Sequence, residues 1–148
     1  KKYDLLKLHW LFLAGEPLDE PTAHWATDGL GVPVIDNYWQ TETGWPAITL
    51  MPGLDLKQVK FGSPGFPSPG YRMKVIDEVT GEELPPNQKG VLVFVPPLPP
   101  GCLTTVWRND ERYVASYFSH LRNCCIARWT GPSATRTATR PFSAAPMT

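Results

Sequence analysis

Proline and glycine are unevenly spread along this sequence, and their placement limits where a helix can form. The 148 residues include 17 prolines and 12 glycines, and most of these lie between positions 44 and 101. Proline removes a backbone donor and glycine lowers helix propensity, so helices are disfavoured in this stretch. Residues 44–101 are therefore predicted to form short strands joined by turns.

Within this stretch the pattern predicts one pair of strands. Residues 71–77 alternate in polarity and predict a strand, residues 78–81 a hairpin turn, and residues 90–95 a second strand. Further along, Asn109 or Asp110 is suited to cap a short helix.

The first 36 residues show the pattern of a parallel α/β unit. Residues 8–14 are apolar and aromatic and predict a buried strand. Residues 18–30 carry apolar side chains near a 3.6-residue period, so they predict a helix, and residues 32–36 predict a second strand. The predicted fold class is α/β: a parallel strand-helix-strand unit followed by a β-rich part.

The residues best suited to bind a ligand follow the second predicted strand. Positions 36–44 read Asp-Asn-Tyr-Trp-Gln-Thr-Glu-Thr-Gly, and open α/β sheets bind ligands at such strand ends. Glu42 is the candidate Mg²⁺ ligand, because Mg²⁺ is held by carboxylates and nucleotide phosphates. Thr41 and Thr43 are candidates to donate to phosphate oxygens, and Asp36 to accept from a base or sugar. The alternative is that Glu42 is simply solvated, as most carboxylates are.

Two other features have both a functional and an ordinary interpretation. Gly15, Glu16 and Pro17 lie at a strand-to-helix turn, which is suited to an anion or a planar base but is also typical of any such turn. Trp39 either lines a small pocket or fills the core, which is the commoner position for tryptophan. The sequence has no glycine-rich phosphate loop, so part of any nucleotide site is expected to be missing from it.

Composition limits the kinds of binding partner and the cellular compartment that are expected for this chain. Fourteen basic and 14 acidic residues cancel, so no overall field attracts nucleic acid or an anionic membrane. The longest apolar runs are far shorter than the roughly 18 residues of a membrane span, and no signal peptide is recognised. The three cysteines lack the spacing of a zinc site or a disulfide framework. These observations predict a cytoplasmic protein, or one of the mitochondrial matrix if eukaryotic.

Because the chain starts with Lys1, it is expected to be internal to a longer protein or processed.

Several stretches together resemble one family. They lie in family order within about residues 1–120, and they are Leu11–Pro17, Val34–Pro46, Gly62–Tyr71, and Pro97–Gly101 leading to Thr105–Trp107. In these stretches the chain resembles the AMP-forming acyl-CoA synthetases of the ANL adenylating superfamily, and within them the acetyl- and propionyl-CoA synthetase branch.

The resemblance implies a fold and a reaction. Residues 1–120 correspond to the C-terminal portion of the large N-terminal adenylating (AMP-binding) domain of an acyl-CoA synthetase. The implied enzyme is an acid–thiol ligase: a small carboxylic acid attacks ATP to give acyl-AMP and pyrophosphate, and CoA then displaces AMP. Its cofactors and co-substrates are ATP/AMP, Mg²⁺ and CoA. No nucleic acid or membrane partner is implied, and the oligomeric state is left open.

The resemblance also assigns roles to individual residues. Positions matching Gly15, Glu16 and Pro17 lie along the adenine. Those that surround the adenine and the α-phosphate match Asp36, Asn37, Tyr38, Trp39, Gln40 and Thr41. Glu42 matches the Mg²⁺ carboxylate, and Thr41 and Glu42 are the implied catalytic residues. Trp39 matches the residue that shortens the acyl pocket, which favours an acid of two or three carbons.

The sequence also departs from the family. The phosphate loop and CoA contacts are expected before Lys1, the lid with the adenylation lysine after Thr148, and the ribose-binding aspartate has no counterpart after Phe118. The fragment alone is expected not to turn over.

Residues 121–148 contain four arginines and no acidic residue, a composition that predicts a disordered basic tail. The alternative is that this segment, which resembles the family only when back-translated in another frame, is translated out of frame through a frameshift or a sequencing error.

A second class of function stays open beside the ligase. It is a small β-rich module without catalysis that binds a ligand on Trp39, Trp45 and Trp107. A degraded gene with an inactive product is a third possibility.

Overall fold

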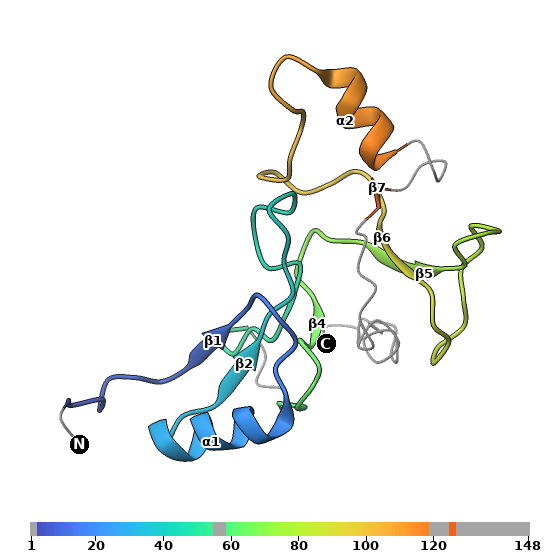
Figure 1. The fold of residues 1–148 in the computed structure, drawn as a ribbon. Coiled ribbons are helices and arrows are strands. Elements are labelled where there is room, and N and C mark those ends of the chain that lie inside the picture. Colours follow the sequence, from blue (N-terminus) through green and yellow to red (C-terminus); the bar gives the residue numbers. More distant parts are fainter. Residues whose placement is uncertain (1–2, 55–58, 119–124, 127–148) are drawn as a thin grey trace, which may run out of the picture.

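A computed structural model describes residues 3–54, 59–118 and 125–126 of the chain. The fold is mixed α/β, with a parallel strand-helix-strand unit followed by small antiparallel sheets, as predicted (Figure 1). The elements in chain order are β1 (Leu11–Leu13), α1 (Glu20–Leu30), β2 (Val34–Asp36), β3 (Ile48–Thr49), β4 (Phe66–Pro67), β5 (Met73–Ile76), β6 (Val91–Phe94), α2 (Asp110–Tyr117) and β7 (Cys125–Ile126).

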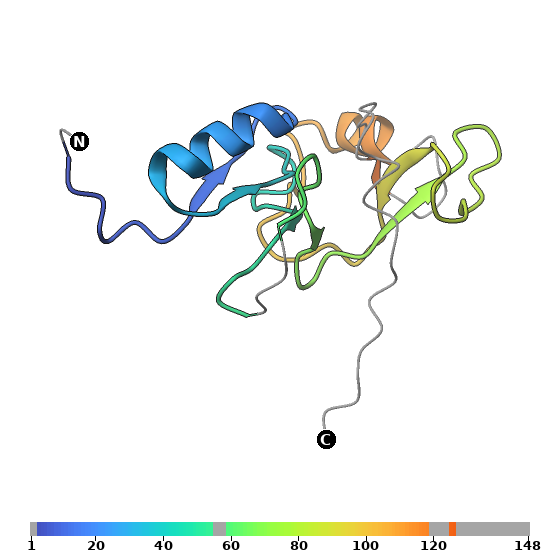
Figure 2. The same ribbon diagram turned by 90° about the horizontal axis from the view of Figure 1, so that it is seen from below.

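The parallel unit forms where the sequence predicts it. α1 begins after Asp19, whose carboxylate accepts a hydrogen bond from the Thr22 N–H at 2.9 Å, and it ends at Gly31, which has a φ of 75°. Such a left-handed residue ends a helix at low cost when it is glycine. β1 and β2 pair in parallel with Leu13 opposite Asp36, so both strands end at the same edge. Figure 2 shows α1 lying along one face of these two strands.

Two predictions about this unit are wrong in detail. The first strand is not buried: Phe12 at its centre is 50% exposed, because in the described part of the chain β1 pairs only with β2. Trp25, which the helical period places on the apolar face of α1, is 77% exposed. The buried residues of α1 are instead Ala23 and Ala26, whose small side chains permit close packing.

The strand-rich half contains the predicted antiparallel pair. β5 and β6 pair with Met73 opposite Phe94 and Ile76 opposite Val91. The turn at residues 78–81 is present, since the Gly81 N–H donates to the Asp77 carbonyl at 2.9 Å. However, that turn returns the chain to a bridge between Ile76 and Glu83, and a further loop precedes β6.

The described core lies mainly between this half and the loop after β2. One buried cluster joins Ala47, Tyr71, Phe94 and Cys102, and Tyr38 and Tyr117 pack against it. A second cluster joins Ile48, Val75 and Leu92. Because Ala47 and Ile48 come soon after the loop of residues 36–44 in the chain, their burial holds the end of that loop against the core.

The C-terminal end of the described chain contains α2 and β7. α2 begins as predicted, with the Asn109 side chain accepting from the Arg112 N–H at 2.9 Å. Within the segment expected to form the tail, the structure describes only β7, which pairs with Val93 and Phe94 of β6. β6 offers an open edge on the side away from β5, and an extended segment satisfies its backbone groups. The other residues after 118 lie outside the described part.

Among the described helices, none combines the length and apolar composition needed to cross a membrane.

Candidate functional site

Two loops meet where the parallel strands end. Residues 15–17 follow β1 and residues 37–40 follow β2, and the parallel register brings the two strand ends together. Between them lies a cavity of about 240 Å³, lined by Gly15, Glu16, Pro17, Asp36, Asn37, Tyr38, Trp39, Gln40 and Pro64. Its volume is below the roughly 300–1,000 Å³ of complete small-molecule sites. The described residues by themselves therefore do not enclose a cavity of that size.

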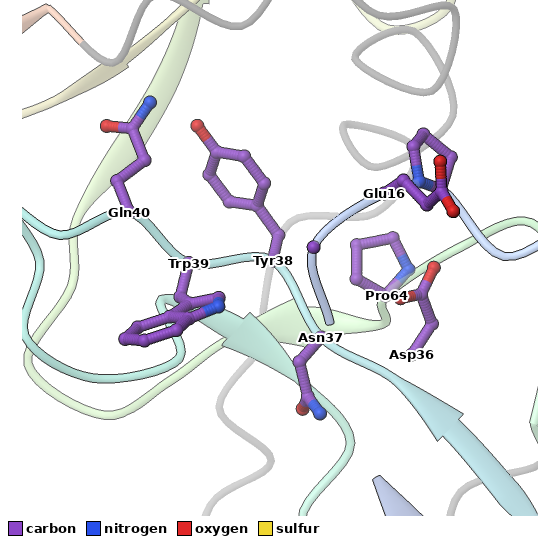
Figure 3. A pocket seen from close by; sticks show the side chains of 9 residues that line it. Glu16, Asp36, Asn37, Tyr38, Trp39, Gln40 and Pro64 are labelled. Atoms are coloured by element: carbon purple, nitrogen blue, oxygen red, sulfur yellow. The ribbon is translucent and has the colours of Figure 1, made fainter. Parts of the chain in front are cut away.

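This cavity gathers most of the residues predicted as a site, namely every one except Thr41, Glu42 and Thr43. Their roles in binding stay predictions. Pro64 was not predicted as a site residue, because the glycine- and proline-rich stretch around it indicates only turns. Figure 3 shows the Tyr38 and Gln40 side chains extending to one side of the loop and that of Asn37 to the other.

Asn37 ties the two strand ends together. Its backbone N–H donates to the Leu13 carbonyl at 2.9 Å and its side-chain amide donates to the same oxygen at 3.1 Å. Its amide oxygen accepts from the Thr49 hydroxyl in β3. The Asn37 side chain is therefore used to join β1, β2 and β3.

Asp36 and Tyr38 are ionisable groups at the cavity. The half-buried Asp36 carboxylate accepts from the Leu18 N–H at 3.3 Å, just before α1. Burial raises the pKa of Asp36 above its ordinary value of 3.8. Burial, and then the negative charge of Glu42, raise the pKa of Tyr38 to about 12. The Tyr38 phenol is therefore neutral near pH 7 and can donate a hydrogen bond.

Asp36 makes the stability of the chain depend on pH in a predictable direction. Because its folded-state pKa is raised, the neutral carboxyl stabilises the fold below pH 3.8, and that contribution is lost as the pH rises through the folded-state pKa. Asp36→Asn keeps an acceptor for Leu18 but cannot ionise. The variant is expected to gain stability relative to the wild type as the pH rises from 3.8 until the carboxyl has fully ionised.

The measurement is urea unfolding of both chains at a series of pH values. The difference in unfolding free energy should increase over that interval and then level off. A difference that is the same at every pH would contradict the burial of Asp36.

Thr43 holds the loop instead of facing a phosphate. Thr43 is buried, with 3% of the residue exposed. The hydroxyl accepts from the Gln40 N–H at 3.0 Å and lies 2.8 Å from the Gln40 carbonyl and 2.9 Å from that of Trp45. The expectation that Thr43 donates to phosphate is therefore wrong for this structure, because its hydrogen-bonding capacity is used within the loop. Thr41, by contrast, is exposed.

The loop is also fixed from outside. The Tyr71 hydroxyl donates to the Thr43 carbonyl at 2.8 Å, and the Leu103 N–H donates to the Glu42 carbonyl at 2.7 Å. Gly44, with a φ of 66°, packs against the backbone of Gly101. Thus the segment around residues 101–103, remote in sequence, supports the loop.

Glu42 lies next to the cavity without lining it. Its half-buried carboxylate accepts a hydrogen bond from the Tyr117 hydroxyl at 2.6 Å. In the described part of the chain no three His, Cys, Asp or Glu residues are grouped so as to hold a metal ion.

Trp39 lines the cavity and is 49% exposed, so the interpretation that it fills the core is wrong. Trp45 and Trp107, the other members of the alternative aromatic platform, are 66% and 86% exposed and do not line this cavity.

Comparison with known proteins gives a consistent result. The family model described as "AMP-binding enzyme" matches residues 1–97. A propionate–CoA ligase of Salmonella typhimurium (strain LT2) is 56% identical over 119 residues, which are 80% of this chain and 19% of that protein. A propionate–CoA ligase of Escherichia coli K12 is 55% identical over the same length. An acetyl-coenzyme A synthetase of Campylobacter jejuni (strain 81-176) is 38% identical over 125 residues, which are 82% of this chain. The chain spans about a fifth of the length of these relatives.

Proposed function

We propose a function from one premise: this chain belongs to the AMP-binding enzyme family. The proposal is that residues 1–120 are part of the adenylating domain of an AMP-forming short-chain acyl-CoA ligase. This enzyme joins propionate or acetate to CoA and converts ATP to AMP and pyrophosphate. The observation that carries the proposal is the cavity in which residues 15–17 and 36–40 meet.

The residues of the cavity suit the adenosine part of such a substrate. Gly15, whose φ is 118°, has no Cβ, so a planar base can approach the backbone there. The Asp36 carboxylate and the Gln40 amide offer an acceptor and a donor to the base or the sugar. Trp39 provides an apolar wall, which suits the short hydrocarbon part of the acid.

Glu42 and Thr41 are the proposed catalytic residues. Glu42 fits a cation that arrives with a nucleotide, because Mg²⁺ is commonly held by one or two carboxylates together with substrate phosphates and water. When bound, Mg²⁺ neutralises phosphate charge during adenylation. The chain itself contributes the Glu42 carboxylate and the exposed Thr41 hydroxyl, on a loop that Thr43 keeps in one conformation.

Nucleotide binding by the 148-residue chain tests the proposal directly. AMP is titrated into the ¹⁵N-labelled chain, and the tryptophan indole N–H signals are followed by NMR. We expect a saturable shift at Trp39, with Trp107 as the internal control because it lies outside the cavity. No saturable shift, or a shift at Trp107 without one at Trp39, contradicts the proposal. Equal shifts at Trp39, Trp45 and Trp107 favour the alternative of an aromatic binding module.

Trp39 gives a prediction about the length of the acid. The test protein is the Salmonella propionate–CoA ligase in which the matched 119-residue segment is replaced by that of this chain. Trp39→Ala removes an apolar wall, and pocket differences of this kind change discrimination by about 1–3 kcal/mol. The ratio of kcat/KM for butyrate to that for propionate is therefore expected to rise about tenfold or more.

Acid-dependent ATP–pyrophosphate exchange with acetate, propionate, butyrate and hexanoate measures this ratio. Trp107→Ala, at an exposed tryptophan away from the cavity, is the matched control and should leave the ratio unchanged. An unchanged ratio in Trp39→Ala would show that this side chain does not limit the acyl pocket.

For residues 121–148 we propose that they do not belong to the adenylating domain and are translated out of frame. Resequencing the locus tests this: another frame should encode an aspartate-containing stretch similar to the family. If none of the frames does so, this proposal is wrong.

A further inference from the structure

Helix α2 is connected to Glu42 by two sets of hydrogen bonds. Directly, the Tyr117 hydroxyl donates to Glu42 Oε1 at 2.6 Å. Indirectly, the Tyr113 hydroxyl donates to the Leu103 carbonyl at 2.7 Å, and the Leu103 N–H donates to the Glu42 carbonyl at 2.7 Å. Both the side chain and the backbone of one glutamate are thus connected to a helix some 70 residues further along the sequence.

The two tyrosines are arranged to hold this position. They are four residues apart and therefore lie on the same side of α2. Their rings are in contact, with centroids 5.5 Å apart. Tyr117 is half-buried and packs against the cluster that contains Ala47, Tyr71 and Phe94. Because packing restricts the Tyr117 ring, its hydroxyl meets the Glu42 carboxylate in a defined direction.

We propose that Tyr117 is a positioning residue, whose phenol orients the Glu42 carboxylate toward a divalent cation carried by the nucleotide. This inference rests on the proposed function. A carboxylate that accepts one hydrogen bond at Oε1 retains lone pairs for a cation. Partners that orient a metal ligand affect metal affinity by about 10–100-fold in characterised sites.

The position of Glu42 relative to the cavity supports the proposal. Its negative charge contributes to the raised pKa of Tyr38, whose side chain lines the cavity. The carboxylate is therefore close enough to influence a group at the ligand site, although it does not line the cavity itself. A cation bridging Glu42 and a nucleotide phosphate needs this kind of placement beside the cavity.

The competing explanation is that Tyr117 only fastens α2 to the rest of the chain. Tyr113 distinguishes the two, because its hydroxyl donates to the backbone carbonyl of Leu103, whereas the Tyr117 hydroxyl donates to the Glu42 carboxylate itself. Tyr113→Phe and Tyr117→Phe each delete one hydroxyl from the same helix. A purely structural role predicts similar effects of both changes on nucleotide binding.

The experiment measures the affinity of the 148-residue chain for AMP, for ATP with EDTA, and for ATP with Mn²⁺, by calorimetry. The readout is the dissociation constant for ATP with EDTA divided by that for ATP with Mn²⁺, a ratio that rises with the contribution of the metal to binding. We expect Tyr117→Phe to lower this ratio about tenfold while the affinity for AMP is unchanged. Tyr113→Phe should leave the ratio as in the wild type.

Each other outcome has a defined meaning. If the wild type does not bind AMP, the proposed function itself fails. If it binds AMP and the ratio is the same in the wild type and Tyr117→Phe, or falls equally in Tyr113→Phe, the positioning role is overturned and the proposed function stands.

A second measurement needs no substitution and applies if Tyr117→Phe fails to fold. Paramagnetic Mn²⁺ bound with ATP at Glu42 should broaden the ring signals of Tyr117 more than those of Tyr113 in the wild-type NMR spectrum. Equal broadening of the two rings, or none at Tyr117, overturns the proposal.

Discussion

Replacing Gly44 with alanine is expected to lower the free energy of unfolding by about 2–5 kcal/mol. Two costs add: a left-handed conformation costs a non-glycine residue about 1–2 kcal/mol, and overpacking typically costs 1–3 kcal/mol. Gly44 has a φ of 66°, and a Cβ there would overlap the Gly101 carbonyl oxygen, with the Gly101 carbonyl carbon at 3.1 Å. These are backbone atoms, so they cannot rotate away as a side chain can.

Gly31→Ala separates the two costs. Gly31 has a similar φ of 75°, but a Cβ there meets nothing within 4 Å. That variant should lose only the conformational part, about 1–2 kcal/mol. Urea unfolding of the three chains, followed by far-UV circular dichroism, gives the comparison. Equal losses in the two variants would show that the loop does not pack on Gly101 as described.

The second large effect is expected at Glu42. In the Salmonella ligase that carries the segment of this chain, Glu42→Gln should lower acid-dependent ATP–pyrophosphate exchange by about 100–1,000-fold, the cost found when one group that stabilises transition-state charge is removed from an oxyanion hole. Glutamine keeps an oxygen that accepts from Tyr117, so the loss isolates the charge. A weakened cation site should also require more Mg²⁺ for half-maximal exchange.

Glu20→Gln is the matched control for charge, because Glu20 lies on α1 with its side chain 70% exposed. This variant should exchange at the unmodified rate. If Glu42→Gln retains exchange within about threefold of that rate, Glu42 is not the carboxylate of the adenylation step.

Local chemistry was enough to predict much of the fold. The 3.6-residue period of residues 18–30 predicted α1, which the structure bounds by Asp19 and Gly31. The capping preference of asparagine likewise predicted the start of α2 at Asn109. The order of strand, helix and strand also predicted that residues 15–17 and 36–40 follow neighbouring strand ends, which is where the structure places them around one cavity.

Burial was predicted less well, because it depends on partners that a periodic pattern does not contain. Phe12 and Trp25 have the spacing of buried residues but are exposed, since β1 has a single described neighbour and α1 packs through Ala23 and Ala26. β7 likewise forms by pairing with the edge of β6 that faces away from β5. The composition of residues 121–148 does not indicate that such an edge is available.

The sequence by itself determined the local elements and the composition of the loop at residues 36–44, because helix caps, turns and strand patterns depend on neighbours along the chain. Only the tertiary structure decided which side chains of that loop remain available. Thr43 is used internally, and Glu42 meets Tyr117, which lies 75 positions away. Contacts across such separations depend on how the core brings segments together, and no short-range pattern encodes that geometry.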